Sequence, residues 1–328
     1  MNRKSNIWRI RNKNSDWFVP FVSRIKNTSD KGFILCPEET RIHGKQRFSF
    51  MYSTHTQFTL VFGAYDYDWY TMNTDIYSIP NLELKLWQDF FLYFSIYTAN
   101  NIDYLCSDKI LCLFSCMNNR AHLHRLYLMD DLAQYNLLTD NFYSWHNNDV
   151  DPKIQQIGFV PRYFDNKPRL LDGHYTKSSQ QYFPTEVSQS CINLVTESEV
   201  DCPFITEKTF NCFLFGKIPI IYGYPGVHKK LKDMGYKLPN NIIDYQKIDC
   251  EKDSRMRSKT IAEEILRLSH EHRDLNRLHR EFLPLVQHNR SLLFNKAKNQ
   301  EGIPDEVLLD EYYVNLLQQC KNKVINYS

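Results

Sequence analysis

The chain has 328 residues, of which 24% are charged and 42% hydrophobic, a composition typical of a globular protein of about two domains. Its formal net charge of +2 is too small to predict a nucleic-acid coat or a polybasic membrane patch. The nine cysteines form no repeating frame and no apolar run approaches the ~20 residues of a membrane span, so we expect reduced thiols, no membrane span and a cytoplasmic location.

The first clear strand is followed by two carboxylates. Gly32–Pro37 is an apolar run of strand length, and Glu38 and Glu39 come directly after it. Carboxylates at the carboxyl end of a strand can be catalytic, and they can equally belong to a polar turn. Their position by itself favours the polar turn.

A second apolar strand, Phe58–Phe62, precedes a pair of aspartates. Asp66 and Asp68 are separated by one residue. Carboxylates at this spacing can hold a divalent cation on a nucleotide diphosphate, although the pattern is common by chance. The next segment, Leu82–Tyr97, has apolar residues at helical spacing and is predicted to be a helix facing the core.

The middle of the chain contains a further strand, Ile110–Ser115, a polar loop and a helix that carries Arg125. A guanidinium one helical turn beyond a strand-end loop can bind a diphosphate, and an ordinary surface arginine is the alternative. Two cysteines and two histidines lie in this region without the spacing of a standard zinc site, so no metal is predicted for Cys112, Cys116, His122 and His124.

A strand–helix–strand unit is predicted for Cys191–Gly226. An apolar run over residues 192–195 forms its first strand, and Ile218–Tyr222 forms its second. Thr206 occupies the N-cap position of the helix between them, and Gly216 the position that ends it. The two strands should be parallel, with a right-handed connection.

The start of this helix is a candidate anion site. The carboxyl end of the first strand and the amino end of the helix meet at one edge of the sheet, where free N–H groups and the helix dipole favour a phosphate. Glu207 and Lys208 in the first turn would add an acceptor for hydroxyls and a cation. Equally open is a capped surface helix, with Glu207 favoured by the dipole and Lys208 solvated.

The remainder is predicted to be mainly helical. Residues 141–190 are irregular, with loops and short elements. The expected elements after Gly226 are a helix at Val227–Met234, a strand near Ile242–Tyr245, a long amphipathic helix at Thr260–Leu293 that Pro284 can kink, and a last helix from Pro304 to Val324.

Residues 194–223 resemble the donor-binding motif of the family 10 glycosyltransferases, the α-1,3/4-fucosyltransferases. The family has Glu-Asn-Ser at a strand end, Asp-Tyr-Ile-Thr-Glu-Lys at a helix start, and small-Gly-x-x-Pro-Val-Val-x-Gly in the next strand. The corresponding residues here are Glu197-Ser198, Pro203-Phe204-Ile205-Thr206-Glu207-Lys208, and Phe215-Gly216-Lys217-Ile218-Pro219-Ile220-Ile221-Tyr222-Gly223.

Three shorter segments look like other parts of the same family. Phe114-Ser115 with Arg125 and Leu132 is similar to its strand–Ser–loop–Arg–helix segment. Residues 58–68 look like its strand followed by Asp-Ser-Asp, which suggests a shared loop rather than a metal site. Residues 37–40 stand where the family has its proposed catalytic base, without the proline that follows the family's glutamate.

The resemblance implies an α/β fold of the GT-B type, in which two Rossmann-like lobes face a cleft. Residues 1–107 would form the acceptor-side lobe, and residues 108–328 the nucleotide-sugar lobe with the C-terminal helices. The implied activity is inverting transfer of a sugar, with fucose from GDP-fucose as the first donor to test, to a hydroxyl of a glycan or other acceptor. Neither a metal nor another cofactor would be required.

The resemblance also implies roles for donor-binding residues. Lys208 and Arg125 would neutralise the departing diphosphate, and Glu207 would bind the ribose hydroxyls. Glu197 would orient the site. Two hydroxyl residues complete the donor-binding set, Ser115 and Thr206.

The catalytic base would come from the first lobe. We expect Glu39 to deprotonate the acceptor hydroxyl, with Glu38 as the alternative, because neighbouring side chains after a strand point to opposite sides. Two other functions remain open. One is a metal-dependent GT-A enzyme using Asp66 and Asp68, and the other is a nucleotide- or carbohydrate-binding protein without catalysis.

Overall fold

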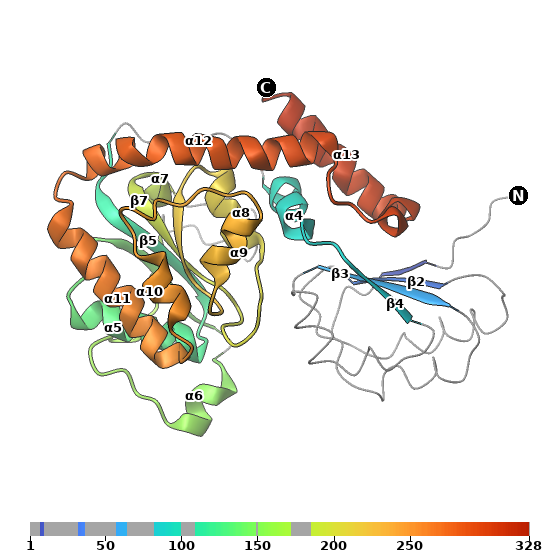
Figure 1. Cartoon of the computed structure of the whole chain (residues 1–328). Coiled ribbons are helices and arrows are strands. Elements are labelled where there is room, and N and C mark those ends of the chain that lie inside the picture. Colours follow the sequence, from blue (N-terminus) through green and yellow to red (C-terminus); the bar gives the residue numbers. More distant parts are fainter. Residues whose placement is uncertain are drawn as a thin grey trace, which may run out of the picture. The chain divides into compact units, whose positions relative to one another are not determined.

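A computed structural model describes residues 7–9, 32–36, 57–63, 82–99, 109–148, 150–171 and 185–327. The chain divides into two compact units (Figure 1). The first contains Met1–Tyr97 and Lys296–Ser328, and the second contains Thr98–Asn295. Each unit has its own four-stranded sheet, and all strand pairs are parallel, so the protein is of the mixed α/β class.

The sheet of the first unit has its strands in chain order. These are β1 (Ile7–Arg9), β2 (Gly32–Cys36), β3 (Phe58–Phe62) and β4 (Leu82–Leu86). All five residues of β3 are buried, as expected for a strand covered on both faces. The strands predicted at β2 and β3 are thus confirmed.

The prediction of one helix over Leu82–Tyr97 is wrong in its first half. Residues 82–86 form β4, and α4 (Phe90–Thr98) begins only after a turn. Leucine alternates with Glu83 and Lys85 over this stretch, which is the two-residue period of a strand rather than the 3.6-residue period of a helix. The helical spacing of the apolar residues in α4 made the preceding residues 82–86 look like part of the same helix.

The C-terminal residues return to the first unit. After the 3-10 helix η4 (Asp305–Leu309), Asp310 caps α13 (Glu311–Ile325) by accepting from the backbone N–H of Tyr312, at 2.9 Å. The ring of Tyr313 lies 5.6 Å from that of Trp87. The prediction placed these C-terminal helices with the second lobe, whereas residues 296–328 group with the first unit.

The second unit has its strands in the order β6-β5-β7-β8. Their bounds are Phe142–Asn148 for β6, Cys112–Arg120 for β5, Ser190–Thr196 for β7 and Ile218–Tyr222 for β8. Every residue of β7 and β8 is buried. The strand predicted to end at Ser115 continues to Arg120, because residues 117–120 still pair with β6 although their pairing with β7 ends at Cys116.

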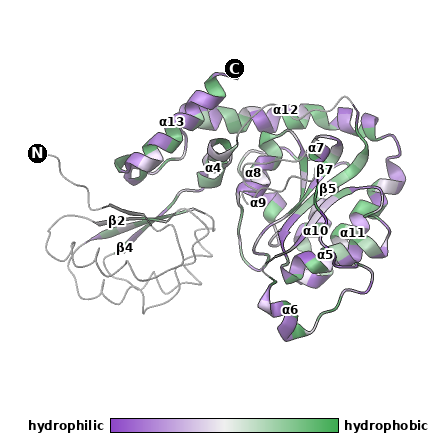
Figure 2. Ribbon diagram, turned by 180° about the vertical axis from the view of Figure 1, so that it is seen from behind, coloured by the Kyte–Doolittle hydropathy of each residue, from purple (hydrophilic) through white to green (hydrophobic). Residues whose placement is uncertain are grey.

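Helices cover both faces of this sheet. The helices of this part of the chain are α5 (Leu123–Gln134), α7 (Thr185–Ser188), α8 (Glu207–Leu214), α9 (Val227–Asp233), α10 (Tyr245–Cys250), α11 (Ser254–Glu271) and α12 (Leu275–Asn299), together with α6 (Pro152–Ile157), which has no buried residue. The chain runs in opposite directions from β5 to β6 and from β7 to β8, so right-handed connections put α5 and α8 on opposite faces. Figure 1 shows α5 with α11 on one side of the sheet and α8 on the other. Apolar residues alternate with polar ones along α11 and α12 (Figure 2).

Two predictions after Gly226 need correction. No strand forms at Ile242–Tyr245; a turn there leads into α10, whose N-cap Asp244 accepts from the N–H of Lys247 at 2.9 Å. The predicted helix over 260–293 is two helices, α11 and α12, with a break at residues 272–274. No helix within the described part of the chain is long and apolar enough to cross a membrane.

Candidate functional site

The strand order of the second unit reverses between β5 and β7, since β6 lies on one side of β5 and β7 on the other. Ligands of open parallel sheets bind beyond the carboxyl ends of the strands at such a reversal. A pocket of about 470 Å³ lies at this edge. Its walls come from Arg120 at the end of β5, the first turns of α5, residues 150–153, the loop 198–201 after β7, and Ser254.

Charged side chains of both signs line this pocket. The cations are Arg120 and Lys153, and the carboxylates are Asp151, Glu199 and Asp201. His122 also lines the pocket. Burial lowers the pKa of its imidazole to about 4, and the positive charges of Arg125, Arg120 and Lys208 act in the same direction. The carboxylate of Asp151, whose Oδ2 lies 3.8 Å from Nδ1 of His122, raises this pKa in part. Two cations therefore line the pocket beside three carboxylates, and Arg125 and Lys208 add positive charge from outside its lining. The cations can bind the anionic groups of a ligand.

Glu197 joins the end of β7 to the start of α8. Its carboxylate is fully buried and accepts from the N–H of Thr206 at 3.0 Å, the hydroxyl of Thr206 at 2.7 Å and the hydroxyl of Thr209 at 2.7 Å. Burial raises the pKa of Glu197, and the positive charge of Lys208 and the Thr206 hydrogen bonds offset part of this effect. All three hydrogen-bond partners donate, so the site is arranged for a carboxylate that positions the helix.

The predicted start and end of α8 are confirmed. Thr206 is the N-cap, with its hydroxyl 3.4 Å from the N–H of Lys208, and Gly216 follows the helix with a positive φ of 73°. The Lys208 ammonium donates to the Thr206 hydroxyl at 3.2 Å and to Oε1 of Glu207 at 3.1 Å. The side chain of Lys208 is 31% exposed and that of Glu207 only 6%. The predicted donor-binding residues 206–208 thus lie together at the edge of the sheet.

Arg125 lies behind the pocket wall. Its guanidinium is 3% exposed and donates from Nη2 to the carbonyls of Thr196 (3.1 Å) and Glu197 (3.4 Å), and from Nη1 to that of Arg120 (3.3 Å). These carbonyls end β7 and β5, the two strands between which the order reverses. Arg125 therefore holds the carboxyl edge together, and its charge acts on the pocket from behind.

Ser115 does not join the other predicted donor-binding residues. It is fully buried inside β5, in register with Asn193, and its hydroxyl lies 3.0 Å from that of Ser190. Because β5 continues to Arg120, Ser115 is far from the carboxyl end of its own strand.

The sequence reasoning missed three residues that line the pocket. The sequence places Arg120 in a predicted loop, His122 in a group without zinc-site spacing, and Lys153 in a region predicted to be irregular. In the structure β5 ends at Arg120 instead of Ser115, so Arg120 and His122 lie at the carboxyl edge of the sheet. The signal that could have found them is the basic and imidazole run Arg120–Arg125 directly before a helix.

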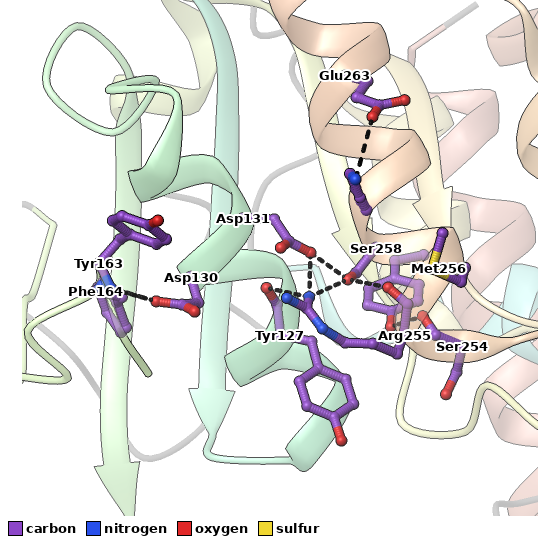
Figure 3. A network of polar contacts seen from close by, with 12 residues as sticks. Tyr127, Asp130, Asp131, Tyr163, Phe164, Ser254, Arg255, Met256, Ser258 and Glu263 are labelled. Carbon is purple, nitrogen blue, oxygen red and sulfur yellow. Dashed lines mark hydrogen bonds and ion pairs between the residues drawn. The ribbon is translucent and has the colours of Figure 1, made fainter. Parts of the chain in front are cut away.

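The first turn of α11 is fastened to α5 beside the pocket (Figure 3). Arg255 donates to Asp131 and, at 3.0 Å, to the hydroxyl of Ser258, and its guanidinium lies 4.9 Å from the ring centre of Tyr127. Ser258 also donates to Asp131. Tyr127 belongs to the pocket wall, so this network fixes one side of the pocket.

A second buried cation fixes the loop after β7. Arg257 is 1% exposed and donates to the carbonyls of Val200 at 2.8 Å and Glu251 at 2.6 Å. The hydroxyl of Tyr222, at the end of β8, donates to the carbonyl of Ser254 at 2.6 Å. The walls formed by Val200 and Ser254 are therefore set by buried hydrogen bonds.

A second pocket, also of about 470 Å³, lies at the other end of the sheet. It is lined by Leu111 and Cys112 at the start of β5 and by His270, His272 and Arg273 at the end of α11. Ligands of parallel α/β sheets bind at the carboxyl ends of the strands, so the pocket at Arg120 is the better candidate.

Four predicted functional residues lie outside the described residues, namely Glu38, Glu39, Asp66 and Asp68. Within the residues that are described, no group of three or more His, Cys, Asp or Glu side chains could hold a metal ion.

No protein-family model matches this chain, and comparison with curated proteins returns no match.

Proposed function

We propose that the protein is an inverting glycosyltransferase that moves a sugar from a nucleotide diphosphate to a hydroxyl of a glycan or other acceptor. GDP-fucose is the first donor to test. The observation that carries the proposal is the pocket at the β5–β7 reversal, which Arg120 and Lys153 line. Residues 206–208, which resemble the donor-binding motif of the fucosyltransferases, do not line it, but the charge of Lys208 acts on His122, which does.

The proposed chemistry follows from charge. Breaking the bond between the sugar and the diphosphate leaves negative charge on the leaving oxygen, and preorganised cations stabilise that charge in the transition state. Lys208, Arg120 and Lys153 would contact the diphosphate, and Arg125 would add its field from behind. Glu207 would accept from the ribose hydroxyls.

The second reactant would be activated from the first unit. Glu39, or Glu38, would take the proton of the acceptor hydroxyl as its oxygen attacks the anomeric carbon from the side opposite the diphosphate. Attack from that side inverts the anomeric centre. The GT-B arrangement belongs to this proposal, and the presence of a parallel sheet in each unit supports it.

A cytoplasmic location is supported by the described cysteines, which are free thiols.

A nucleotide screen tests the proposal. Thermal unfolding would be followed with GDP, UDP, CMP and dTDP in the presence of EDTA. A nucleotide at 100 times its dissociation constant should add about 2.7 kcal/mol to the free energy of unfolding. We expect GDP to stabilise the protein most, and stabilisation by none of the four would contradict the proposal.

Lys208→Met then locates the site. We expect it to weaken GDP binding and to cut turnover of GDP-fucose by about 10²-fold or more, the scale for losing one charge-stabilising group. Lys229→Met is the matched control, because Lys229 is 75% exposed and pairs only along its own helix with Asp233. Equal effects of the two substitutions would place the donor elsewhere.

Chelation separates the two catalytic alternatives. The proposed mechanism retains activity in EDTA, and Asp66→Asn should act only through folding or acceptor binding. Activity that requires added manganese or magnesium, and that Asp66→Asn abolishes, would favour the GT-A enzyme. Tight GDP binding with no transfer to any acceptor and no donor hydrolysis would favour a binding protein.

A further inference from the structure

Exposed apolar side chains gather in one short segment of the second unit. Of the twelve exposed large hydrophobic side chains among the described residues, five lie between 150 and 170: Val150, Ile157, Val160, Tyr163 and Leu170. Ile157 is 61% exposed and Val160 79%. No residue of α6 is buried. We call the exposed side chains of residues 150–170 the α6 surface.

The α6 surface is also basic. Its segment contains Lys153, Arg162, Lys167 and Arg169, all exposed, against Asp151 and Asp165, so it carries four positive and two negative charges, a net +2. The whole chain of 328 residues has the same formal net charge of +2. The α6 surface therefore has twice as many basic as acidic side chains, whereas the chain as a whole has nearly equal numbers, 40 and 38.

The segment is held in place by buried contacts. Asp130 of α5 accepts from the N–H groups of Tyr163 at 2.7 Å and Phe164 at 3.0 Å (Figure 3). Arg169 exchanges two backbone hydrogen bonds with Trp145, each 2.8 Å long. The Phe164 ring is buried and lies edge-on to Trp145, 5.3 Å away. Backbone hydrogen bonds and a buried aromatic ring thus fix the position of a segment whose other apolar side chains are exposed to water.

We propose that the α6 surface binds the interface of an anionic lipid bilayer. Apolar side chains would enter the region between headgroups and acyl chains, while Lys and Arg would contact the anionic headgroups. Apolar and basic residues are interspersed along the segment. Long basic side chains can keep their charge in the headgroup layer while their stems pack beside apolar neighbours. The centre of a protein–protein interface, in contrast, is depleted of lysine and of carboxylates, although arginine is enriched there.

The position of α6 agrees with this binding mode. Within the second unit, α6 lies at the end away from α12 (Figures 1 and 2). Pro152 and Lys153 of α6 and the adjacent Val150 also line the pocket. A protein bound through the α6 surface would therefore hold the pocket next to the membrane. The proposal does not depend on the proposed transferase activity.

Vesicle co-sedimentation of the full chain tests the proposal. The probes are phosphatidylcholine vesicles with and without phosphatidylserine, each at low and high salt. We expect the protein to sediment with the phosphatidylserine vesicles at low salt and much less with the neutral ones. High salt should weaken binding, because it screens exposed charges.

Two double variants separate the apolar and the basic contributions. Ile157→Asp with Val160→Asp should lower the partition coefficient about tenfold or more, because two apolar side chains no longer leave water. Arg162→Gln with Lys167→Gln should lower it about fivefold for each basic residue removed. Leu308→Asp with Leu309→Asp is the matched control, since these residues are 49% and 51% exposed in the first unit. Melting curves would verify that all the variants fold.

Three results would overturn the proposal. They are absence of sedimentation with the phosphatidylserine vesicles, sedimentation unchanged in both α6 variants, and an equal loss in the control. Self-association without vesicles that Ile157→Asp with Val160→Asp abolishes would assign the α6 surface to a second copy of the chain instead.

Discussion

At the residue scale, two glutamates of the motif, Glu197 and Glu207, have different roles. Glu197 is buried and uses its carboxylate on three donors of its own chain, whereas Glu207 lies next to the partly exposed ammonium of Lys208. The sequence shows both as glutamates beside a helix start. Only the contacts indicate that Glu197 positions the helix and that the Glu207–Lys208 pair lies at its tip.

The proposed catalytic base, Glu39, can be tested by substitution. Glu39→Gln should lower turnover by 10²–10⁴-fold, the range for a general base, and leave the GDP dissociation constant unchanged. Glu38→Gln is the control and should stay within a few-fold of wild type. Initial rates with GDP-fucose and calorimetry with GDP measure the two effects. Reversed effects would exchange the two residues, and full activity of both variants would contradict the mechanism.

His122 should make stability depend on pH. Its pKa is about 4 in the folded protein against an ordinary value of 6.5, so the unfolded chain binds the proton more tightly. The free energy of unfolding should therefore fall as the pH is lowered from above 6.5 towards 4. His279, whose pKa burial also lowers to about 4, contributes in the same range.

Urea unfolding at pH 7 and pH 5 checks this expectation. His122→Gln should reduce the loss of stability between the two pH values by about 1–2 kcal/mol. His270→Gln, at an exposed histidine of α11, is the control and should leave the loss unchanged. A His122→Gln variant with the same pH dependence as wild type would show that the imidazole is not kept neutral by its surroundings.

At the element scale, α8 shows which boundaries a sequence can predict. Thr206 and Gly216 act through local backbone chemistry, a side-chain cap and a positive φ, so both ends of the helix are visible in the sequence. The end of β5 is different. Asn118, Asn119 and Arg120 look like a loop, and only pairing with β6 keeps them in the strand. Pairing between strands far apart in the chain therefore sets the end of β5 at Arg120. This end places Arg120 and His122 at the pocket.

Glu197→Gln tests the link between β7 and α8. An amide cannot accept three hydrogen bonds as a carboxylate does, so a buried donor of Thr206 or Thr209 would lose its partner. We expect the free energy of unfolding to fall by about 1–3 kcal/mol, measured in urea. Glu263→Gln is the control, because Glu263 is 39% exposed and pairs with surface lysines. A loss no larger than that of the control would contradict the positioning role.

At the scale of the whole molecule, the parallel α/β class, most strands and the cap of α8 could be predicted from the sequence. The return of the C-terminal helix to the first unit could not, because it rests on packing between segments far apart in the chain. Tyr313 contacts Trp87, and the Cys320 thiol donates to the carbonyl of Tyr93 at 3.1 Å. The lining of the pocket could not be predicted either: none of the six predicted donor-binding residues belongs to it, whereas Arg120, His122 and Lys153 do.

Tyr313→Ala tests the division into two units. Tyr313 is fully buried in the first unit, so its truncation should cost about 3–5 kcal/mol of stability. The GDP dissociation constant should stay unchanged at a temperature where the variant is folded, because every residue that lines the pocket belongs to the second unit. Tyr312→Ala, at a half-buried neighbour, is the milder control. A parallel loss of GDP affinity would show that the site depends on the first unit's core.

Calorimetric titration with GDP in EDTA tests the central claim most directly, namely that the cations at the β5–β7 reversal bind a nucleotide diphosphate without a metal. We predict one GDP per chain, with affinity lowered about 10–100-fold for each of the substitutions Arg120→Met and Lys153→Met, the range for losing a hydrogen bond to a charged group. Arg273→Met, at the other pocket, should leave the affinity unchanged. Absence of GDP binding by the wild-type protein, or equal affinities in all three variants, would contradict the claim.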